Sequence, residues 1–206
     1  MSNRGKNPYR RPDAFTKAAK AQGYPARSVF KLEEIDRRTR LFRQGQRVLD
    51  LGAAPGSWSM YAAQKIGAGG KLLAVDLSPI QVALGPNATA SQGDALSLAN
   101  EALALHAPYD VVLSDMAPST TGNKLADQAR SFELFMRAVE VAVALGAPGS
   151  AFVGKIFMGE DFEQARAALR KAYGEVRVIR PEGTRSVSFE VFLVGLAKKA
   201  PPPAPT

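Results

Sequence analysis

The sequence predicts an α/β protein with a doubly wound, mostly parallel sheet that ends in a C-terminal antiparallel hairpin. From residue 47 onward, short apolar segments alternate with helical stretches, which is the pattern of βαβ units. The last two strand-like segments, 175–181 and 188–196, have no helix between them. Because parallel neighbours need a long crossover, we expect these two strands to pair antiparallel.

The individual elements follow from local patterns. Apolar residues at helical spacing predict a helix over about 28–40, with Ser28 as its N-cap, and another helix precedes it. The remaining predicted strands cover 47–52, 71–76, 88–94, 109–115 and 150–157, and the third of these is weak. The remaining predicted helices cover 57–66, 97–105, 124–145 and 160–173.

The composition predicts one domain with short appendages, since 206 residues at 46% hydrophobic suffice for one sizeable core. We expect a basic N-terminal arm and helix over 1–46, the α/β domain over 47–197, and a disordered proline-rich tail over 198–206. No internal repeat is evident. The default oligomeric state is a monomer, because no heptad pattern or extra apolar stripe requires a partner.

The charge of the chain is concentrated at one end. The net charge is +8, and residues 1–47 hold 13 Lys/Arg against 4 Asp/Glu. This excess indicates a polyanion-binding arm, most plainly for nucleic acid, or alternatively a solvated basic tail. The aromatic residues among these charges are expected either to stack on bases or to anchor the arm to the domain. They are Tyr9, Phe15, Tyr24 and Phe30.

Several kinds of site are excluded by composition. The chain has no cysteine and one histidine, so disulfides, thiolate zinc sites, cysteine nucleophiles and multi-histidine metal sites are ruled out. His106 is expected in a loop or at a helix end. The basic, polar start is not a secretory signal, and no window resembles a membrane span. We therefore expect a soluble, cytoplasmic protein without a membrane partner or a metal.

The first strand runs into the glycine-rich turn "VLDLGAAPGSWSMYAA". Two of the three glycines of the dinucleotide fingerprint are missing, which argues against a nicotinamide-dependent oxidoreductase. Gly52 and Gly56 remain, on either side of Pro55. Such a turn lets the backbone approach a ligand without forming a phosphate cradle.

Acidic residues end four successive strands, where α/β sheets bind ligands. They are Asp50, Asp76, Asp94 and Asp115. Asp50 suits a positively charged ligand. Asp76 is placed to bind ribose hydroxyls, and Asp94 is placed to accept from an adenine amino group. Trp58 is expected near the loop. Each acid alone is equally well read as a helix cap or a solvated strand end, but together they describe a nucleoside pocket that suits S-adenosylmethionine.

A lysine interrupts an apolar strand in "AFVGKIFMG". Burying an ammonium without a partner is costly, so Lys155 either extends its stem to water or ends the strand at a site. We expect Asp115 beside it on the neighbouring strand, and Glu190 at the same edge if the last strand inserts next to the fifth. Lys31 is expected to fold over this edge from the preceding helix.

These segments together resemble the FtsJ-like family of ribosomal RNA ribose 2′-O-methyltransferases. The matching pieces run in order from about residue 24 to 197: "RSVFKLEEID", "VLDLGAAPGSWS", "VDLSP", "GD", "LSDMAPSTTG", "FVGKIFMGEDF" and "RPEGTRSVSFEVFLV". The resemblance implies a seven-stranded, Rossmann-like methyltransferase domain over 47–197. It also implies that the substrate is a uridine ribose in large-subunit (23S) ribosomal RNA, within the large ribosomal subunit.

The resemblance also assigns roles to residues. The family's catalytic Lys-Asp-Lys-Glu set falls on Lys31, Asp115, Lys155 and Glu190. Its S-adenosyl-L-methionine-binding residues fall on Gly56, Trp58, Asp76, Asp94 and Asp115, to which the local pattern adds Gly52. The chain departs from the family at four positions: Ser57, Ser119, Gly154 and Phe192. The family's usual residues at these positions are glycine, asparagine, valine and tyrosine, in that order.

The chemistry expected from this set is proton removal from a ribose hydroxyl. A lysine accepts a proton only as the neutral amine, which burial and a nearby cation favour, so Lys155 is the expected proton acceptor. The alternatives are a transfer-RNA or cap ribose 2′-O-methyltransferase and a non-catalytic ribosome-assembly factor. A base-amino methyltransferase fits less well, because "DMAPS" replaces the aromatic-ended Pro-Pro motif that clamps a flipped base.

Overall fold

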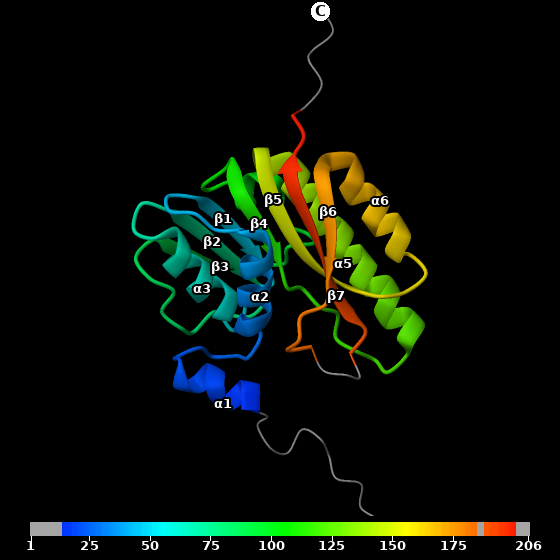
Figure 1. Cartoon of the computed structure of the whole chain (residues 1–206), viewed down its shortest axis with the longest axis horizontal. Coiled ribbons are helices and arrows are strands. Elements are labelled where there is room, and N and C mark those ends of the chain that lie inside the picture. Colours follow the sequence, from blue (N-terminus) through cyan, green and yellow to red (C-terminus); the bar gives the residue numbers. More distant parts are fainter. Residues whose placement is uncertain (1–13, 185–187, 201–206) are drawn as a thin grey trace, which may run out of the picture.

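Seven strands form one sheet in the order β3–β2–β1–β4–β5–β7–β6 in this computed structural model, which describes residues 14–184 and 188–200 (Figure 1). Strands β1 to β5 pair in parallel, and β7 lies antiparallel between β5 and β6. The predicted sheet and its C-terminal hairpin are confirmed. The strands are Arg47–Leu51 (β1), Lys71–Asp76 (β2), Ala88–Gln92 (β3), Tyr109–Ser114 (β4), Gly146–Phe157 (β5), Tyr173–Ile179 (β6) and Glu190–Lys198 (β7).

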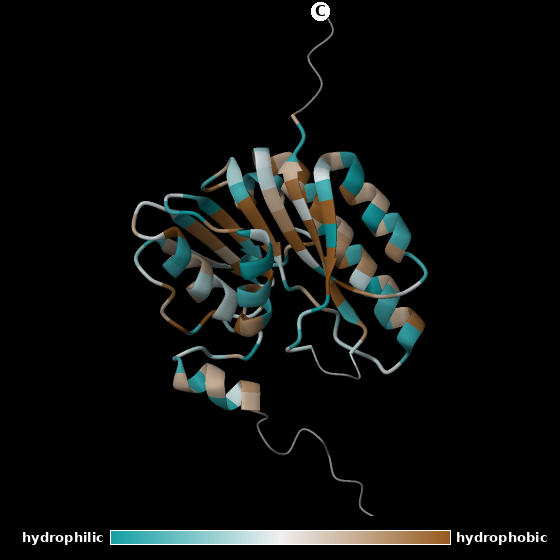
Figure 2. Cartoon of the chain, in the orientation of Figure 1, coloured by the Kyte–Doolittle hydropathy of each residue, from teal (hydrophilic) through white to brown (hydrophobic). Residues whose placement is uncertain are grey.

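Helices cover both faces of the sheet. Figure 1 shows α2 and α3 on one face and α5 and α6 on the other. The helices are Ala14–Ala21 (α1), Val29–Thr39 (α2), Ser57–Ile66 (α3), Asn100–Leu103 (α4), Lys124–Leu145 (α5) and Phe162–Ala172 (α6). Hydrophobic residues fill the central strands, while hydrophilic residues colour much of the outward surface of the helices (Figure 2).

The core consists of two apolar layers, one on each face of the sheet. Because side chains alternate along a strand, Val48 and Val153 pack toward α2 and α3, whereas Leu49 and Phe152 pack toward α5 and α6. All four are fully buried. Strand β3 lies at the edge and is mostly exposed, which explains its weak apolar pattern in the sequence.

Two local predictions are wrong. Ser28 does not cap α2 with its side chain, because its own backbone is already helical (φ −58°, ψ −22°), whereas a capping serine needs an extended backbone. The helix expected over 97–105 covers only Asn100–Leu103. The residues before it instead form a turn around Asp94, which accepts hydrogen bonds from the Leu96 and Ser97 backbone N–H groups.

The helices before β1 belong to the same packed unit. Tyr24 is buried and its hydroxyl donates to Gln64 on α3, while Phe15 of α1 packs against Phe30 of α2 at 5.9 Å between ring centroids. Tyr24 therefore anchors this region to the domain. Residues 1–13 of the predicted basic arm and residues 201–206 of the proline-rich tail lie outside the described residues. Within the described part of the chain, no helix is long and apolar enough to cross a membrane.

Candidate active site

The turn between β1 and α3 is packed tightly against the neighbouring loops. Gly52 has φ +76°, and a Cβ there would lie 2.8 Å from the Met116 backbone nitrogen. Gly56 has φ +113°, and a Cβ there would lie 2.5 Å from Val82 Cγ2. Both positions therefore require glycine, since neither the conformation nor the space admits a side chain.

A cavity of about 340 Å³ lies at the carboxyl edge of the sheet, beside this turn. Three of the predicted acids, Asp76, Asp94 and Asp115, line it together with Gly52. Asp76 accepts hydrogen bonds from the backbone N–H groups of Ala54 (2.9 Å) and Ser78 (2.7 Å), so its carboxylate is held in place. The cavity is rich in fixed acceptors and suits a nucleoside that carries positive charge.

The fourth acid is not in this cavity. Asp50 is completely buried and accepts a hydrogen bond from the Ser59 hydroxyl at 2.6 Å. Asp50 lies on the face of the sheet that α3 covers, so its side chain points beneath the turn toward α3. The expectation that Asp50 faces a ligand is therefore wrong. Burial raises the pKa of Asp50 to about 7, the Ser59 hydrogen bond opposes that rise, and the charges of Asp115 and Asp76 add to it.

Trp58 lies behind the turn, outside the residues that line the cavity. It is 2% exposed, its indole Nε1 donates to the Ser28 carbonyl at 2.9 Å, and its ring packs against Phe192 at 5.6 Å. It therefore ties the start of α3 to the start of α2. Other residues that line the cavity were not predicted, among them Leu77, Leu96 and Met116. Leu77 and Leu96 are exposed apolar side chains, for which no sequence pattern indicates a role.

The predicted lysine–carboxylate set forms two ion pairs. Lys155 Nζ lies 2.8 Å from Asp115 Oδ1 and donates to the Asp115 main-chain carbonyl at 2.7 Å. Lys31 Nζ pairs with Glu190 Oε1. Each of these four side chains is at most 19% exposed. Lys155 is thus buried with a carboxylate partner near the carboxyl end of β5.

Strand β7 brings the two pairs to the same edge. It inserts beside β5 in a register that places Phe192 opposite Lys155 and Glu190 opposite Phe157. The segment before β7 is also tied to α2, because Glu34 accepts from the Glu182 backbone N–H at 2.8 Å. The pairing of β7 with β5 therefore places Glu190 where it meets Lys31 of α2.

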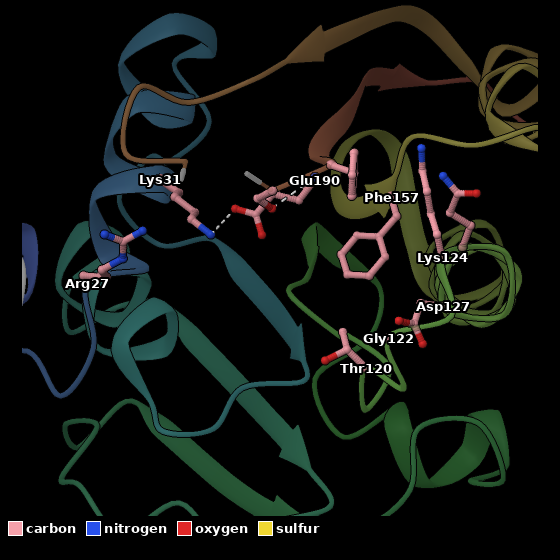
Figure 3. A pocket seen from close by; sticks show the side chains of 11 residues that line it. Arg27, Lys31, Thr120, Gly122, Lys124, Asp127, Phe157 and Glu190 are labelled. Carbon is pink, nitrogen blue, oxygen red and sulfur yellow. Dashed lines mark hydrogen bonds and ion pairs between the residues drawn. The ribbon is translucent and has the colours of Figure 1, made fainter. Parts of the chain in front are cut away.

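A second cavity, of about 490 Å³, lies on the other side of this centre. Figure 3 shows Arg27 and Lys31 on one side of it, Phe157 and Lys124 on the other, and Glu190 between them. Sequence reasoning missed Arg27, Lys124 and Phe157. These residues lie in the turn before α2, on α5 and on β5, so only the folded chain brings them together.

The doubly wound sheet with one antiparallel strand and an acid-lined cavity at its carboxyl edge defines the class of Rossmann-like methyltransferases. A structure from Plasmodium falciparum, described as a ribosomal RNA methyltransferase, superposes with a TM-score of 0.75 at 22% identity over 86% of this chain and all of that one. Aeropyrum pernix fibrillarin with bound S-adenosyl-L-methionine gives 0.55 at 18% identity, over 75% of this chain and 67% of that one. These two likenesses concern the fold.

Sequence comparison identifies the family. A model of the FtsJ-like methyltransferases matches residues 24–198. The chain is 79% identical over 200 residues to "Ribosomal RNA large subunit methyltransferase E" of Sorangium cellulosum, covering 97% of this chain and 94% of that protein. It is 46% identical to the protein of the same name from Bdellovibrio bacteriovorus, over 93% and 99% of the two chains. The chain belongs to the FtsJ-like methyltransferase family and is a methyltransferase.

The structure accounts for three of the four departures from the family pattern. The Ser57 hydroxyl accepts from the Ala26 N–H (2.8 Å) and lies 3.1 Å from the Ala26 carbonyl, to which it donates. Phe192 is fully buried against Trp58. A Cβ at Gly154 would lie 2.5 Å from Phe152 Cζ, so the neighbouring ring fills the space of a larger side chain. Nothing in the structure explains Ser119.

Proposed function

We propose that this protein transfers a methyl group from S-adenosyl-L-methionine to the ribose 2′-hydroxyl of a uridine in large-subunit ribosomal RNA. The observation that carries the proposal is the Lys155–Asp115 pair. Asp115 lines the acid-rich cavity, and Phe157, two residues after Lys155 on β5, lines the second cavity. The pair therefore stands between a site for the cofactor and a site for the substrate. The names of the relatives support ribosomal RNA as the substrate.

The cofactor is S-adenosyl-L-methionine, which supplies an electrophilic methyl group on a positively charged sulfur. The cavity fits it chemically, because carboxylates line a space with no phosphate cradle. In our proposal Asp76 takes the ribose hydroxyls, Asp94 the adenine amino group, and Asp115 faces the positive charge. Gly52 permits the close approach of the backbone, while Gly56 and Trp58 hold the turn from behind.

The chain's own residues prepare the attacking oxygen. Lys155, as the neutral amine, would accept the proton of the ribose 2′-hydroxyl while that oxygen takes the methyl group, and the sulfur of the cofactor would keep the electron pair of the broken carbon–sulfur bond. Asp115 fixes Lys155 Nζ through its carboxylate and its main-chain carbonyl. Lys31 and Glu190 orient the ribose, and the alignment of the reacting atoms supplies much of the rate.

The proposal extends to the RNA and the cellular setting. The basic arm and helix over 1–46 would contact phosphates and fix the register on a large RNA without reading its sequence. Helix α1, with Lys17 and Lys20, lies beyond the same edge of the sheet as the ion pairs (Figure 1). We infer a monomer that acts on the large ribosomal subunit in the cytoplasm.

The test is methyl transfer from labelled cofactor to large subunits that lack the modification, mapped as resistance of one nucleotide to alkaline cleavage. Wild-type protein should give one resistant uridine. Lys155→Met, which keeps the length of the side chain but has no basic nitrogen, should lose at least about 100-fold in rate, the contribution typical of a positioned proton acceptor. The matched variant Lys171→Met, at an exposed lysine, should keep the wild-type rate.

Three results would contradict the proposal, each in a different part. Transfer by Lys155→Met at the wild-type rate would remove Lys155 from the chemistry. Transfer to transfer RNA or to a cap ribose, with none to subunits, would keep the reaction but replace the substrate. Bound cofactor with no transfer to any RNA would favour a non-catalytic assembly factor.

A further inference from the structure

Phe189 is an aromatic side chain that lines the second cavity and is 51% exposed. Its backbone is fixed, because its carbonyl accepts a hydrogen bond from the Met158 N–H at 2.9 Å, extending the pairing of β5 and β7 by one residue. Its ring is also oriented, since Lys124 Nζ lies 4.5 Å from the ring centroid. The half-exposed ring thus lines the cavity from a fixed backbone, with an ammonium group beside it.

The chemistry around this ring matches a nucleotide. Met158 adds a second exposed apolar side chain, 44% exposed, next to Phe189. Three cationic side chains, Arg27, Lys31 and Lys124, line the same cavity. A π-face beside positive charges complements a flat base with carbonyl acceptors joined to phosphates.

The place of the ring fixes which nucleotide it meets. Phe189 directly precedes Glu190, which pairs with Lys31 and in the proposed function orients the reacting ribose. A ribose held at Glu190 therefore has its own base within reach of the Phe189 ring. A base that stays in a helical stack is covered on both faces, so this contact requires the base to be turned out.

We propose that the Phe189 ring is a stacking platform for the turned-out base of the target nucleotide, with the Lys124 ammonium beside it. This inference rests on the proposed function, because it places the reacting ribose at Glu190. Phe189 acts here as a substrate-positioning residue. Its loss should impair binding of the RNA more than the chemical step, and it should leave the separate cofactor cavity intact.

The first experiment compares Phe189→Ala, Phe189→Trp and a control, Leu105→Ala, which truncates an exposed apolar side chain outside both cavities. Removal of a stacked ring should raise KM for unmodified subunits about tenfold with little change in kcat. Tryptophan should restore the wild-type KM, and the control should behave as wild type. All three variants should bind S-adenosyl-L-methionine normally. An unchanged KM in Phe189→Ala would overturn the platform.

The second experiment does not depend on methyl transfer. Large-subunit RNA transcribed with 4-thiouridine is irradiated with the protein, and the crosslinked residue is identified by mass spectrometry. A crosslink at Phe189, lost in Phe189→Ala, supports the platform even if the wild type transfers no methyl group, a result that would overturn the proposed reaction alone. Efficient transfer with all crosslinks away from Phe189 would overturn the platform alone.

Discussion

Replacing Asp50 with asparagine should remove a large pH-dependent term from the free energy of unfolding. Asp50 is completely buried beneath the turn between β1 and α3, and burial raises its pKa from 3.8 to about 7. Between these values the folded protein holds a proton on this carboxyl that the unfolded chain has released. The folded state therefore becomes less stable as the pH rises through this window, and the full cost is present above pH 7.

The magnitude follows from the size of the shift. One pKa unit corresponds to about 1.4 kcal/mol, so a rise of roughly three units costs about 4 kcal/mol once Asp50 is ionised. In the wild type the Ser59 hydroxyl donates to the Asp50 carboxylate at 2.6 Å. Asparagine is a neutral isostere whose side-chain carbonyl can still accept this hydrogen bond. The stability difference, Asp50→Asn minus wild type, should grow by about 1.4 kcal/mol per pH unit between pH 4 and 7.

Urea unfolding measured at several pH values provides the assay. The only tryptophan, Trp58, is 2% exposed in the folded state and reports unfolding by its fluorescence. Ser59→Ala serves as a second variant, because loss of its hydrogen bond should raise the pKa of Asp50 further and move the pH-dependent window upward. A stability difference between wild type and Asp50→Asn that stays constant from pH 4 to 8 would refute this reasoning.

Four further perturbations test other parts of the structure. Gly154→Val, the family's usual residue, should lower the free energy of unfolding by about 1–3 kcal/mol, because it collides with the Phe152 ring; undiminished urea stability would contradict this packing. Ser57→Ala should lower the free energy of unfolding by about 1–2 kcal/mol, because the Ala26 backbone N–H and carbonyl lose their partner, and Ser57→Thr should have a smaller effect. Equal losses for the two variants in thermal unfolding would argue against these hydrogen bonds. Asp76→Ala should lower the affinity for S-adenosyl-L-methionine at least about tenfold by calorimetry, as expected for hydrogen bonds to a charged group; unchanged affinity would remove it from the cofactor site. Affinity for RNA should fall about tenfold between roughly 50 and 200 mM salt for every two phosphates contacted, and a flat salt titration would exclude the basic arm as a polyanion site.

The architecture was predictable because its signals are local. Strands β1, β2, β4 and β5 are short apolar runs, and the absence of a helix between the last two strands identifies their antiparallel pairing. The pairing of Lys155 was predictable for the same reason, since a lone lysine in a buried strand needs a partner. Asp115, on the neighbouring strand, is that partner.

The errors concern features that depend on distant contacts. Asp50 and Asp76 both occur near strand ends. The Asp50 side chain is buried beneath the turn between β1 and α3, whereas Asp76 lines the cavity. Ser57 accepts a hydrogen bond from the Ala26 backbone, and Gly154 leaves room for the Phe152 ring. No sequence pattern indicates either contact. Phe189 reads as an ordinary strand residue until the fold places it beside Lys124.

Strand β7 is the last strand of the sheet in sequence, yet it occupies an interior position between β5 and β6 and carries Glu190. During synthesis, β5 therefore has an unpaired edge until the residues of β7 have left the ribosome. The Lys31–Glu190 pair also forms only at that point. A partly synthesised chain would thus lack both the Lys31–Glu190 pair and the strand that joins β5 to β6.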